Sequence, residues 1–256
     1  MKMFDKRYLS LLREIAVTRY KLKDQRTFLG FIWSFLNPLI MLSLLFVLFN
    51  ARLGNKIDHY AIYLLIGLVQ YTHFSNSTNR SMQVLLSMRD LTSDAIFPKE
   101  LLVIGSVIAD VVELVASMAV CLTIAGLAGV HLSWSILMLP FVFLLQLTLV
   151  LWVSLCLSCV YVFVRDLAHV YQAFMRLLLF ATPIFYHASF LGEGAAQYVV
   201  WLNPLAHLVG FSRSLILDGG LFSMHQMILF FAANLVLLYW SIRLFRRYEP
   251  VFAEYV

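Results

Sequence analysis

The feature that most limits what this chain can fold into is a series of long apolar runs that carry almost no charge. The first, residues 28–49, contains no Asp, Glu, Lys or Arg. At about 1.5 Å per residue, a helix of this length crosses the roughly 30 Å apolar layer of a bilayer. Charged residues form only 13% of the chain, against about 25% in soluble domains. The sequence therefore predicts a helical membrane protein and argues against a soluble enzyme or a nucleic-acid-binding domain.

Six such runs predict a single all-α, polytopic transmembrane domain over residues 1–256. The predicted spans are 28–49, 60–79, 101–129, 134–164, 167–187 and 224–242. Residues 188–223 mix glycine and polar residues with short apolar stretches, which favours short helices that enter the membrane without crossing it. Residues 80–100 are charged and contain Pro98, so we expect an exit from the membrane and a return into it.

The N-terminal segment, residues 4–26, has a different pattern. Basic residues such as Arg13 and Arg19 alternate with apolar ones such as Leu12 and Ile15 at helical spacing. This pattern is typical of an amphipathic helix that lies along a membrane surface with its basic side toward anionic headgroups.

The distribution of basic residues predicts the orientation. With six spans, 15 of the 19 Lys and Arg fall on the side that holds both termini. Arg52, Lys56 and Arg213 fall on the other side, and Arg176 lies within a span. Because cytoplasmic loops are enriched in Lys and Arg, both termini are predicted to be cytoplasmic.

Motifs for catalysis are missing from the sequence. It contains no G-x-x-x-x-G-K-[ST] phosphate loop, no H-E-x-x-H and no G-x-S-x-G. The seven histidines are scattered along the chain. We therefore predict no catalytic residue, no metal site and no nucleotide site in this chain, and an integral-membrane enzyme is disfavoured.

Ionisable residues within spans are informative because each is costly in lipid. Asp110 and Glu113 lie three residues apart, on one face of a helix. They could form a proton relay, as in an ion-coupled carrier, or they could face other parts of the protein. Arg176 could face a water-filled path and attract an acidic group, or it could pair with a neighbouring helix.

Aromatic residues make up 15% of the chain, and several lie within or at the ends of predicted spans. Aromatic faces can stack on sugar rings without a fixed hydrogen-bond pattern, although each residue could equally serve packing. Together with Arg176, the candidates for a substrate path are Phe31, Trp33, Phe35, Phe174, Phe180, Phe185 and Tyr186.

Four blocks in order resemble the permease subunits of ABC transporters that export polysaccharides. They are TRYKLKDQRTFLGFIWSFLNPLI, IFPKELLVIGSVI, FVRDLAHVYQAFMRLLLFATPIFY and YVVWLNPLAHLVGFSRSLIL. In the first block, the family's basic element and L-G-x-x-W-x-x-x-x-P pattern correspond to Arg19-Tyr20-Lys21, Leu29-Gly30, Trp33 and Asn37-Pro38. The ending RYEPVFAEYV is similar to the tails of O-antigen exporters. The resemblance covers nearly the whole chain.

The resemblance implies half of a channel in the bacterial inner membrane. Two copies would form a homodimer, and two separate ATPase subunits would bind ATP and Mg²⁺. The cargo would be a lipid-linked polysaccharide of the O-antigen type, with capsule or teichoic acid as alternatives. Residues 188–223 would form a periplasmic gate, and Arg165 and Asp166 would lie at the cytoplasmic mouth. The residues that would couple to the ATPase are Arg13, Arg19, Arg80, Arg89, Asp90 and Asp94.

Overall fold

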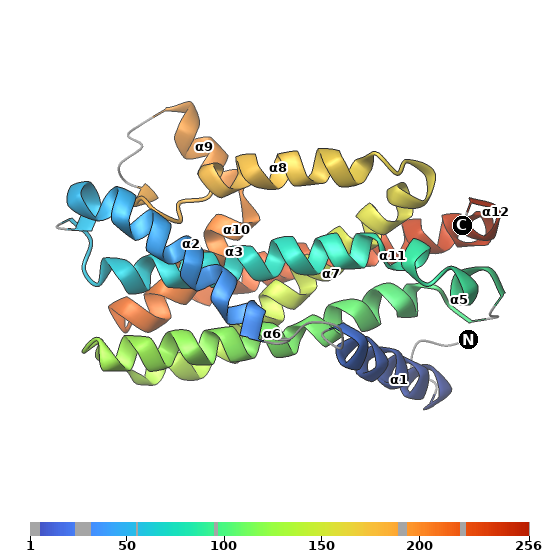
Figure 1. Cartoon of the computed structure of the whole chain (residues 1–256), viewed down its shortest axis with the longest axis horizontal. Helices are drawn as coiled ribbons and strands as arrows, with labels where there is room; N and C mark the ends of the chain where they lie inside the picture. Colours follow the sequence, from blue (N-terminus) through green and yellow to red (C-terminus); the bar gives the residue numbers. More distant parts are fainter. Residues whose placement is uncertain are drawn as a thin grey trace.

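A computed structural model of the chain describes residues 6–23, 32–54, 56–94, 97–188, 194–220 and 224–255. Every regular element within these ranges is a helix, which confirms the predicted all-α class. The long helices run between two ends of an elongated bundle (Figure 1). The first and last helices lie at the same end of this bundle, which we call the terminal end. The opposite end holds α9 and is called the α9 end.

Four helical segments are long and apolar enough to cross a membrane. They are Phe35–Gly54, Glu100–Leu127, Trp134–Phe163 and Met224–Val251. The first runs from the third residue of α2 (Trp33–Phe49) through the π-helical turn η2 (Asn50–Gly54), and the second is α6 (Glu100–Leu127). The third begins with the 3-10 turn η3 (Trp134–Met138) and continues as α7 (Leu139–Phe163). The fourth comprises α11 (Met224–Tyr248) and the 3-10 turn η6 (Glu249–Val251).

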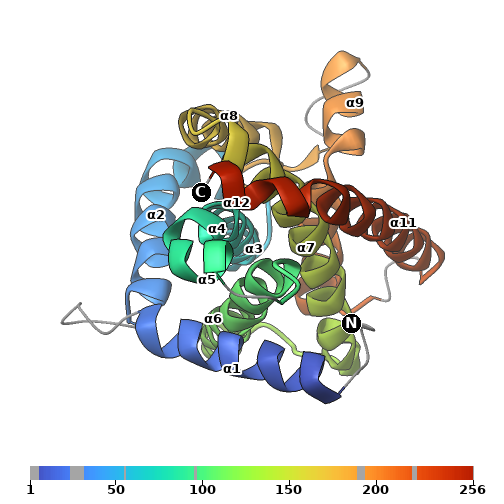
Figure 2. The same cartoon turned by 90° about the vertical axis from the view of Figure 1, so that its right-hand side faces the viewer.

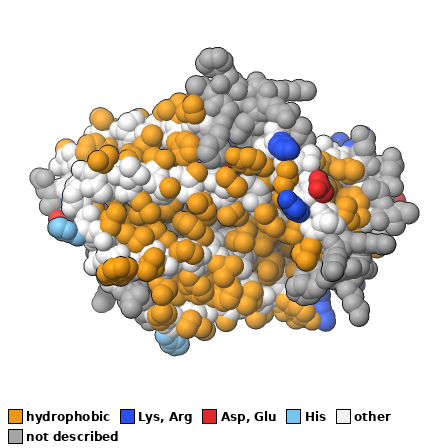
Figure 3. Space-filling view, turned by 90° about the horizontal axis from the view of Figure 1, so that it is seen from below, with side chains coloured by type: hydrophobic (Ala, Val, Ile, Leu, Met, Phe, Trp, Pro, Cys, Tyr) orange, Lys and Arg blue, Asp and Glu red, His pale blue; other side chains and the backbone are white. Residues whose placement is uncertain are grey.

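One face of the molecule shows why these segments suit a bilayer. Seen from below, hydrophobic side chains cover most of the described surface (Figure 3). The Lys and Arg side chains visible on this face lie toward one end. The protein is therefore embedded in a membrane, where an apolar exterior meets lipid rather than water.

Helix α3 (Tyr60–Met82) is too polar in its second half to resemble a lipid-facing span, yet it occupies the centre of the bundle (Figure 2). Several of its polar side chains are bonded within the protein. Gln70 Nε2 donates to Ser212 Oγ at 2.7 Å, and Gln146 Nε2 donates to the Gln70 carbonyl oxygen at 3.0 Å. Polar groups can lie at membrane depth when neighbouring helices satisfy them in this way.

Helix α8 (Leu167–Ala181) ends six residues before the predicted end of the 167–187 span. Thr182 is extended, with φ −90° and ψ 132°, and it precedes Pro183. A residue before proline is disfavoured in the helical region, so the helix stops there. With 15 residues, α8 is about 22 Å long, shorter than the apolar core of a bilayer. The predicted fifth span is therefore a short helix followed by a non-helical segment of turns and bends.

Short helices occupy both ends of the bundle. The terminal end holds α1 (Lys6–Lys23), α4 (Val84–Ser87), α5 (Arg89–Asp94) and α12 (Phe252–Tyr255). Helix α1 lies across the bundle next to α6 (Figure 2). Toward the α9 end, residues 194–220 form α9 (Ala195–Leu202), α10 (Pro204–Arg213) and the π-helical turn η5 (Ser214–Asp218). Helix α10 packs into the bundle against α3 and α7.

Candidate functional site: a charged cluster and an anchored strap

At the terminal end, one arginine holds two buried carboxylates. Arg80, in the last turn of α3, places Nη2 3.0 Å from Asp110 Oδ1 and 2.8 Å from Glu113 Oε2 of α6. The carboxylate side chains are 3% and 7% exposed, whereas that of Arg80 is 35% exposed. Charge-assisted hydrogen bonds of this kind are short and strong, and they tie α3 to α6. Asp110 and Glu113 thus share one helix face, as predicted, and that face is turned toward Arg80.

Arg19 of α1 joins the same region. Its Nη2 donates to Ser87 Oγ of α4 at 3.2 Å. Burial lowers the pKa of the Arg19 guanidinium below its usual range, and the nearby Asp110 carboxylate opposes that shift. Arg19, Arg80 and Asp110 line one cavity of about 350 Å³. The structure therefore brings together two of the predicted coupling residues, and we call Arg19, Arg80, Asp110 and Glu113 the charged cluster.

Close packing holds α1 against α6 beside this cluster. A methyl group built at Gly105 would lie 2.6 Å from Ile15 Cγ2 and 3.5 Å from the Ala16 backbone nitrogen. Only glycine leaves α1 room to approach α6 so closely. Sequence reasoning missed Gly105, whose only signal was an isolated glycine within a helical run.

A second ion pair connects α6 to α11. Arg246 Nε donates to Glu100 Oε1 at 3.0 Å and to Glu100 Oε2 at 3.1 Å. Tyr8 of α1 lies buried beside them, and burial together with the Glu100 charge raises the pKa of its phenol to about 12. The start of α6 is thus fixed to both the first helix and the last long one, a contact that the sequence did not indicate.

At the α9 end, side chains anchor the non-helical segment that follows α8. We call residues 182–186 the strap. Side chains of α3 and α10 donate to four consecutive strap carbonyls. The bonds are Arg213 Nη1 to Pro183 O at 2.6 Å, Arg213 Nη2 to Ile184 O at 2.7 Å, Tyr60 OH to Phe185 O at 2.9 Å and Tyr63 OH to Tyr186 O at 3.0 Å. Because residues 183–186 lie outside the helix, these side chains satisfy carbonyl groups that would otherwise lack a helical partner.

Arg213 is the centre of this anchorage. It is 7% exposed, its guanidinium lies 3.3 Å from the centroid of the Tyr63 ring, and it also donates to the Tyr63 carbonyl. Gly67 makes room for it, since a Cβ there would lie 2.9 Å from Arg213 Nη2. Within the described ranges, no carboxylate forms an ion pair with Arg213. Its sequence signal was only a basic residue within an apolar stretch, and its role was missed.

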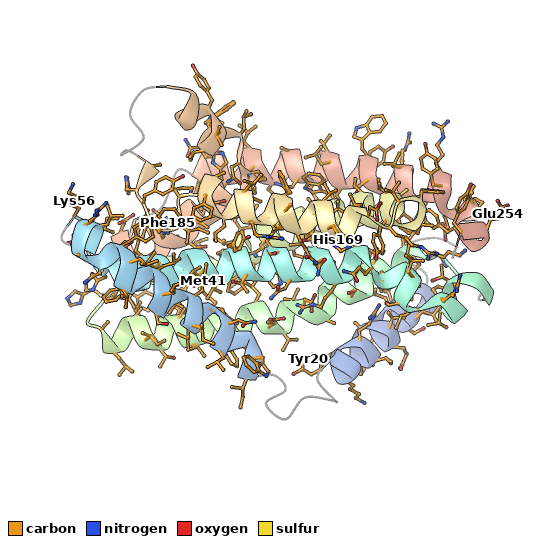
Figure 4. All side chains as sticks on the ribbon, turned by 45° about the horizontal axis from the view of Figure 1, so that its top comes forward. Tyr20, Met41, Lys56, His169, Phe185 and Glu254 are labelled. Carbon is orange, nitrogen blue, oxygen red and sulfur yellow. The ribbon has the colours of Figure 1, made fainter. Side chains whose placement is uncertain are left out.

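The predicted path residues fall into two groups. Phe174, Arg176 and Phe180 are exposed on α8. Phe185 of the strap lies 5.8 Å from Phe180 and 5.1 Å from Tyr186 between ring centroids. The structure therefore brings together the aromatic residues at the end of α8, and Figure 4 labels Phe185 there.

The other predicted path residues lie elsewhere. Trp33 is exposed at the start of α2, and Phe35 is half-buried two residues later. These two residues lie far from the strap, because Phe185 stacks on Phe49, at the far end of α2, with ring centroids 4.9 Å apart. Phe31 lies outside the described residues.

The remaining predicted residues lie at the terminal end. Arg13 is exposed on α1 and Arg89 is exposed on α5. Asp90 and Asp94 belong to α5, but their side chains lie outside the described part of the structure. Arg165 and Asp166 are exposed in the turn between α7 and α8.

Apolar helices that bury charged side chains near both ends of the bundle are typical of membrane transport proteins. Residues 14–217 match the family model described as ABC-2 type transporter, so the chain belongs to this family of transporter membrane subunits. Such a subunit works with an ATPase subunit.

Three similar proteins carry the name O-antigen export system permease protein RfbA. The one from Myxococcus xanthus is 27% identical over 248 residues, which cover 96% of this chain and 95% of that protein. Two from Klebsiella pneumoniae are 24% and 23% identical over 246 and 245 residues, covering 95% of this chain and 94% of each.

Proposed function

We propose that the chain is the permease subunit of an ATP-driven exporter that moves a lipid-linked polysaccharide of the O-antigen type across the bacterial inner membrane. The observation that carries this proposal is likeness over about 95% of the chain to permeases named for O-antigen export in two genera. The same names favour O-antigen over capsule or teichoic acid as cargo.

The topology of this proposal uses six crossings. Helices α3 and α8 cross in addition to the four long apolar segments. Neighbouring helices shield α3 from lipid, and α8 crosses although it is shorter than the apolar core of the bilayer. Both termini then lie on the cytoplasmic side, which is supported by the 15 of 19 basic residues placed there. The terminal end is cytoplasmic and the α9 end is periplasmic.

The chain acts as a homodimer around a shared path. His169, Gln172 and Arg176 share one face of α8, and all three are exposed in the single chain. A guanidinium that faces lipid is costly, so this polar face is better placed on a water-filled path between two copies. Aromatic residues at its end, Phe180 and Phe185, would offer weak, repeatable contacts to a sliding glycan.

Two ATPase subunits, which bind the ATP and Mg²⁺, drive the dimer from the cytoplasmic side. They contact α1 and α5, including Arg13 and Arg89. The charged cluster then carries displacement of α1 to α3 and α6, because Arg19 bonds α4 and Arg80 bonds α6. A lever requires such stiff connections, since packed elements move as rigid bodies.

Deletion of the chain from its host tests this function. We expect surface polysaccharide to be lost while lipid-linked polymer accumulates inside the inner membrane. Re-expression with the partner ATPase should restore export, and re-expression with an ATPase unable to hydrolyse ATP should not. Unchanged surface polysaccharide in the deletion strain would contradict the proposal, as would uphill transport by the purified chain alone on an ion gradient.

A further inference from the structure

A cavity of about 770 Å³ opens at the α9 end. Its walls come from the connection between η2 and α3, the residues after the strap, α9, α10 and η5. The volume falls within the roughly 300–1,000 Å³ typical of small-molecule sites. Lys56, which borders the cavity, is labelled at this end in Figure 4. The coupling and path residues do not account for this cavity.

The charges that line the cavity cancel. Lys56 and Arg213 contribute two positive charges, and Asp58 and Asp218 contribute two negative ones. A compact anion would therefore gain little from the balanced field, and a lipid tail would have to desolvate the charged groups. A polyhydroxyl ligand suits this lining better, because each hydroxyl both donates and accepts a hydrogen bond. Carboxylates accept, lysine donates, and the histidines do either, whereas the Arg213 N–H groups are bonded to backbone carbonyls.

The cavity also contains an aromatic platform. Trp201 of α9 borders the cavity and is 68% exposed. His207 Nε2 donates to the Trp201 carbonyl oxygen at 2.7 Å, which ties α9 to α10 at this point. An exposed indole beside charged hydrogen-bonding groups is suited to the C–H face of a sugar ring, since one side of the ligand is apolar and its edge is polar.

We propose that this cavity binds a short, uncharged stretch of saccharide, with one site in each protomer. The proposal rests on the proposed function and adds to it a place where the glycan is held at the periplasmic end. Trp201 stacks on a sugar ring, and Asp58 and Asp218 accept hydrogen bonds from its hydroxyls. The site is distinct from the polar face of α8, which the cavity does not include.

Binding to the full chain in complex with its ATPase, without ATP, tests the proposal. The probe is the host's own surface polysaccharide, released from its lipid by mild acid and fractionated into short oligosaccharides. Calorimetry would compare wild type with Trp201→Ala, Trp201→Phe and Trp134→Ala. Trp134 is a matched control because it is 87% exposed and does not border the cavity.

We expect saturable binding that Trp201→Ala weakens about tenfold or more, while Trp201→Phe and Trp134→Ala stay within about threefold of wild type. Because Trp201 is largely exposed, the melting temperature of Trp201→Ala should match that of wild type. Equal affinity in Trp201→Ala, or an equal loss in Trp134→Ala, would overturn the proposal.

Inorganic pyrophosphate serves as a second probe. Competition by pyrophosphate at the same site would assign the cavity to anions and overturn the proposal. Export in cells distinguishes failure of the saccharide site from failure of the proposed export function. A deletion strain that loses surface polysaccharide, combined with absent saccharide binding, rejects this site and leaves the proposed function intact. A deletion strain that keeps its polysaccharide rejects both.

Discussion

The two ends of the bundle hold an arginine in opposite ways. At the terminal end, Arg80 meets two carboxylates, and at the α9 end Arg213 meets backbone carbonyls and the face of Tyr63. The carboxylates neutralise the Arg80 charge and join two helices, whereas the bonds from Arg213 to carbonyls fix the conformation of the strap. Under the proposed function, we expect the terminal end to transmit motion between helices and the α9 end to hold one conformation.

The largest effect is expected from Arg213→Met. Four bonds to carbonyls vanish and the strap keeps buried acceptors without partners, so we expect a loss on the order of 4 kcal/mol in the free energy of unfolding. Denaturant unfolding in detergent would measure it. Arg213→Lys keeps the charge but lacks the planar guanidinium. Its free energy of unfolding should lie between those of wild type and Arg213→Met. Wild-type stability in Arg213→Met would show that the strap does not depend on this anchorage.

A smaller loss, about 3 kcal/mol, is expected from Arg80→Met, which leaves two buried carboxylates without their cation. The loss is smaller because the carboxylates can take up protons. The triple variant Arg80→Met, Asp110→Asn, Glu113→Gln removes all three charges together and should recover most of the stability. The same unfolding measurement checks both.

Export by the triple variant also decides between two mechanisms. An ATP-driven exporter should retain part of its activity, because no step moves protons through Asp110 or Glu113. A proton-coupled carrier would lose all transport. Complete loss of export in a protein with normal membrane abundance would therefore favour a proton relay through Asp110 and Glu113.

Gly105→Ala tests the close packing at the terminal end. The added methyl collides with Ile15, and we expect about 1–3 kcal/mol of destabilisation, together with weaker coupling of ATP hydrolysis to export. Gly126→Ala is the matched control on α6, since the nearest atom to its new Cβ lies 3.8 Å away. The comparison uses ATPase activity per exported chain in reconstituted vesicles. If the two variants hydrolyse the same amount of ATP per exported chain, the packing of α1 on α6 does not contribute to coupling.

The smallest effect on stability is expected from Arg176→Ala. The side chain is exposed on α8, so unfolding should change by less than about 0.5 kcal/mol. Export should nevertheless fall, because the polar face of the path loses its cation. Pulse-labelled polysaccharide at the cell surface, normalised to membrane abundance, measures this, with Val170→Ala, an exposed apolar residue of α8, as control. Full export by Arg176→Ala would remove it from the path.

The sequence predicted some of these contacts and gave no indication of others. The spacing of Asp110 and Glu113 placed both on one face, and the structure confirms it, but nothing in the pattern identified Arg80 as their partner. The strap was predicted as helix because its residues are apolar, although Pro183 was the visible signal against it. Arg213 and Gly105 were missed because each is a single residue within an apolar run.

What the amino-acid sequence determined by itself is the solvent and the helical class. These follow from composition and periodicity, which act locally along the chain. Only the tertiary structure decided which charge meets which, because Arg80 and Asp110 are 30 residues apart and Arg213 and Tyr63 are 150 apart. A helical pattern states which face is buried, but the neighbour on that face is chosen by how all the helices pack together.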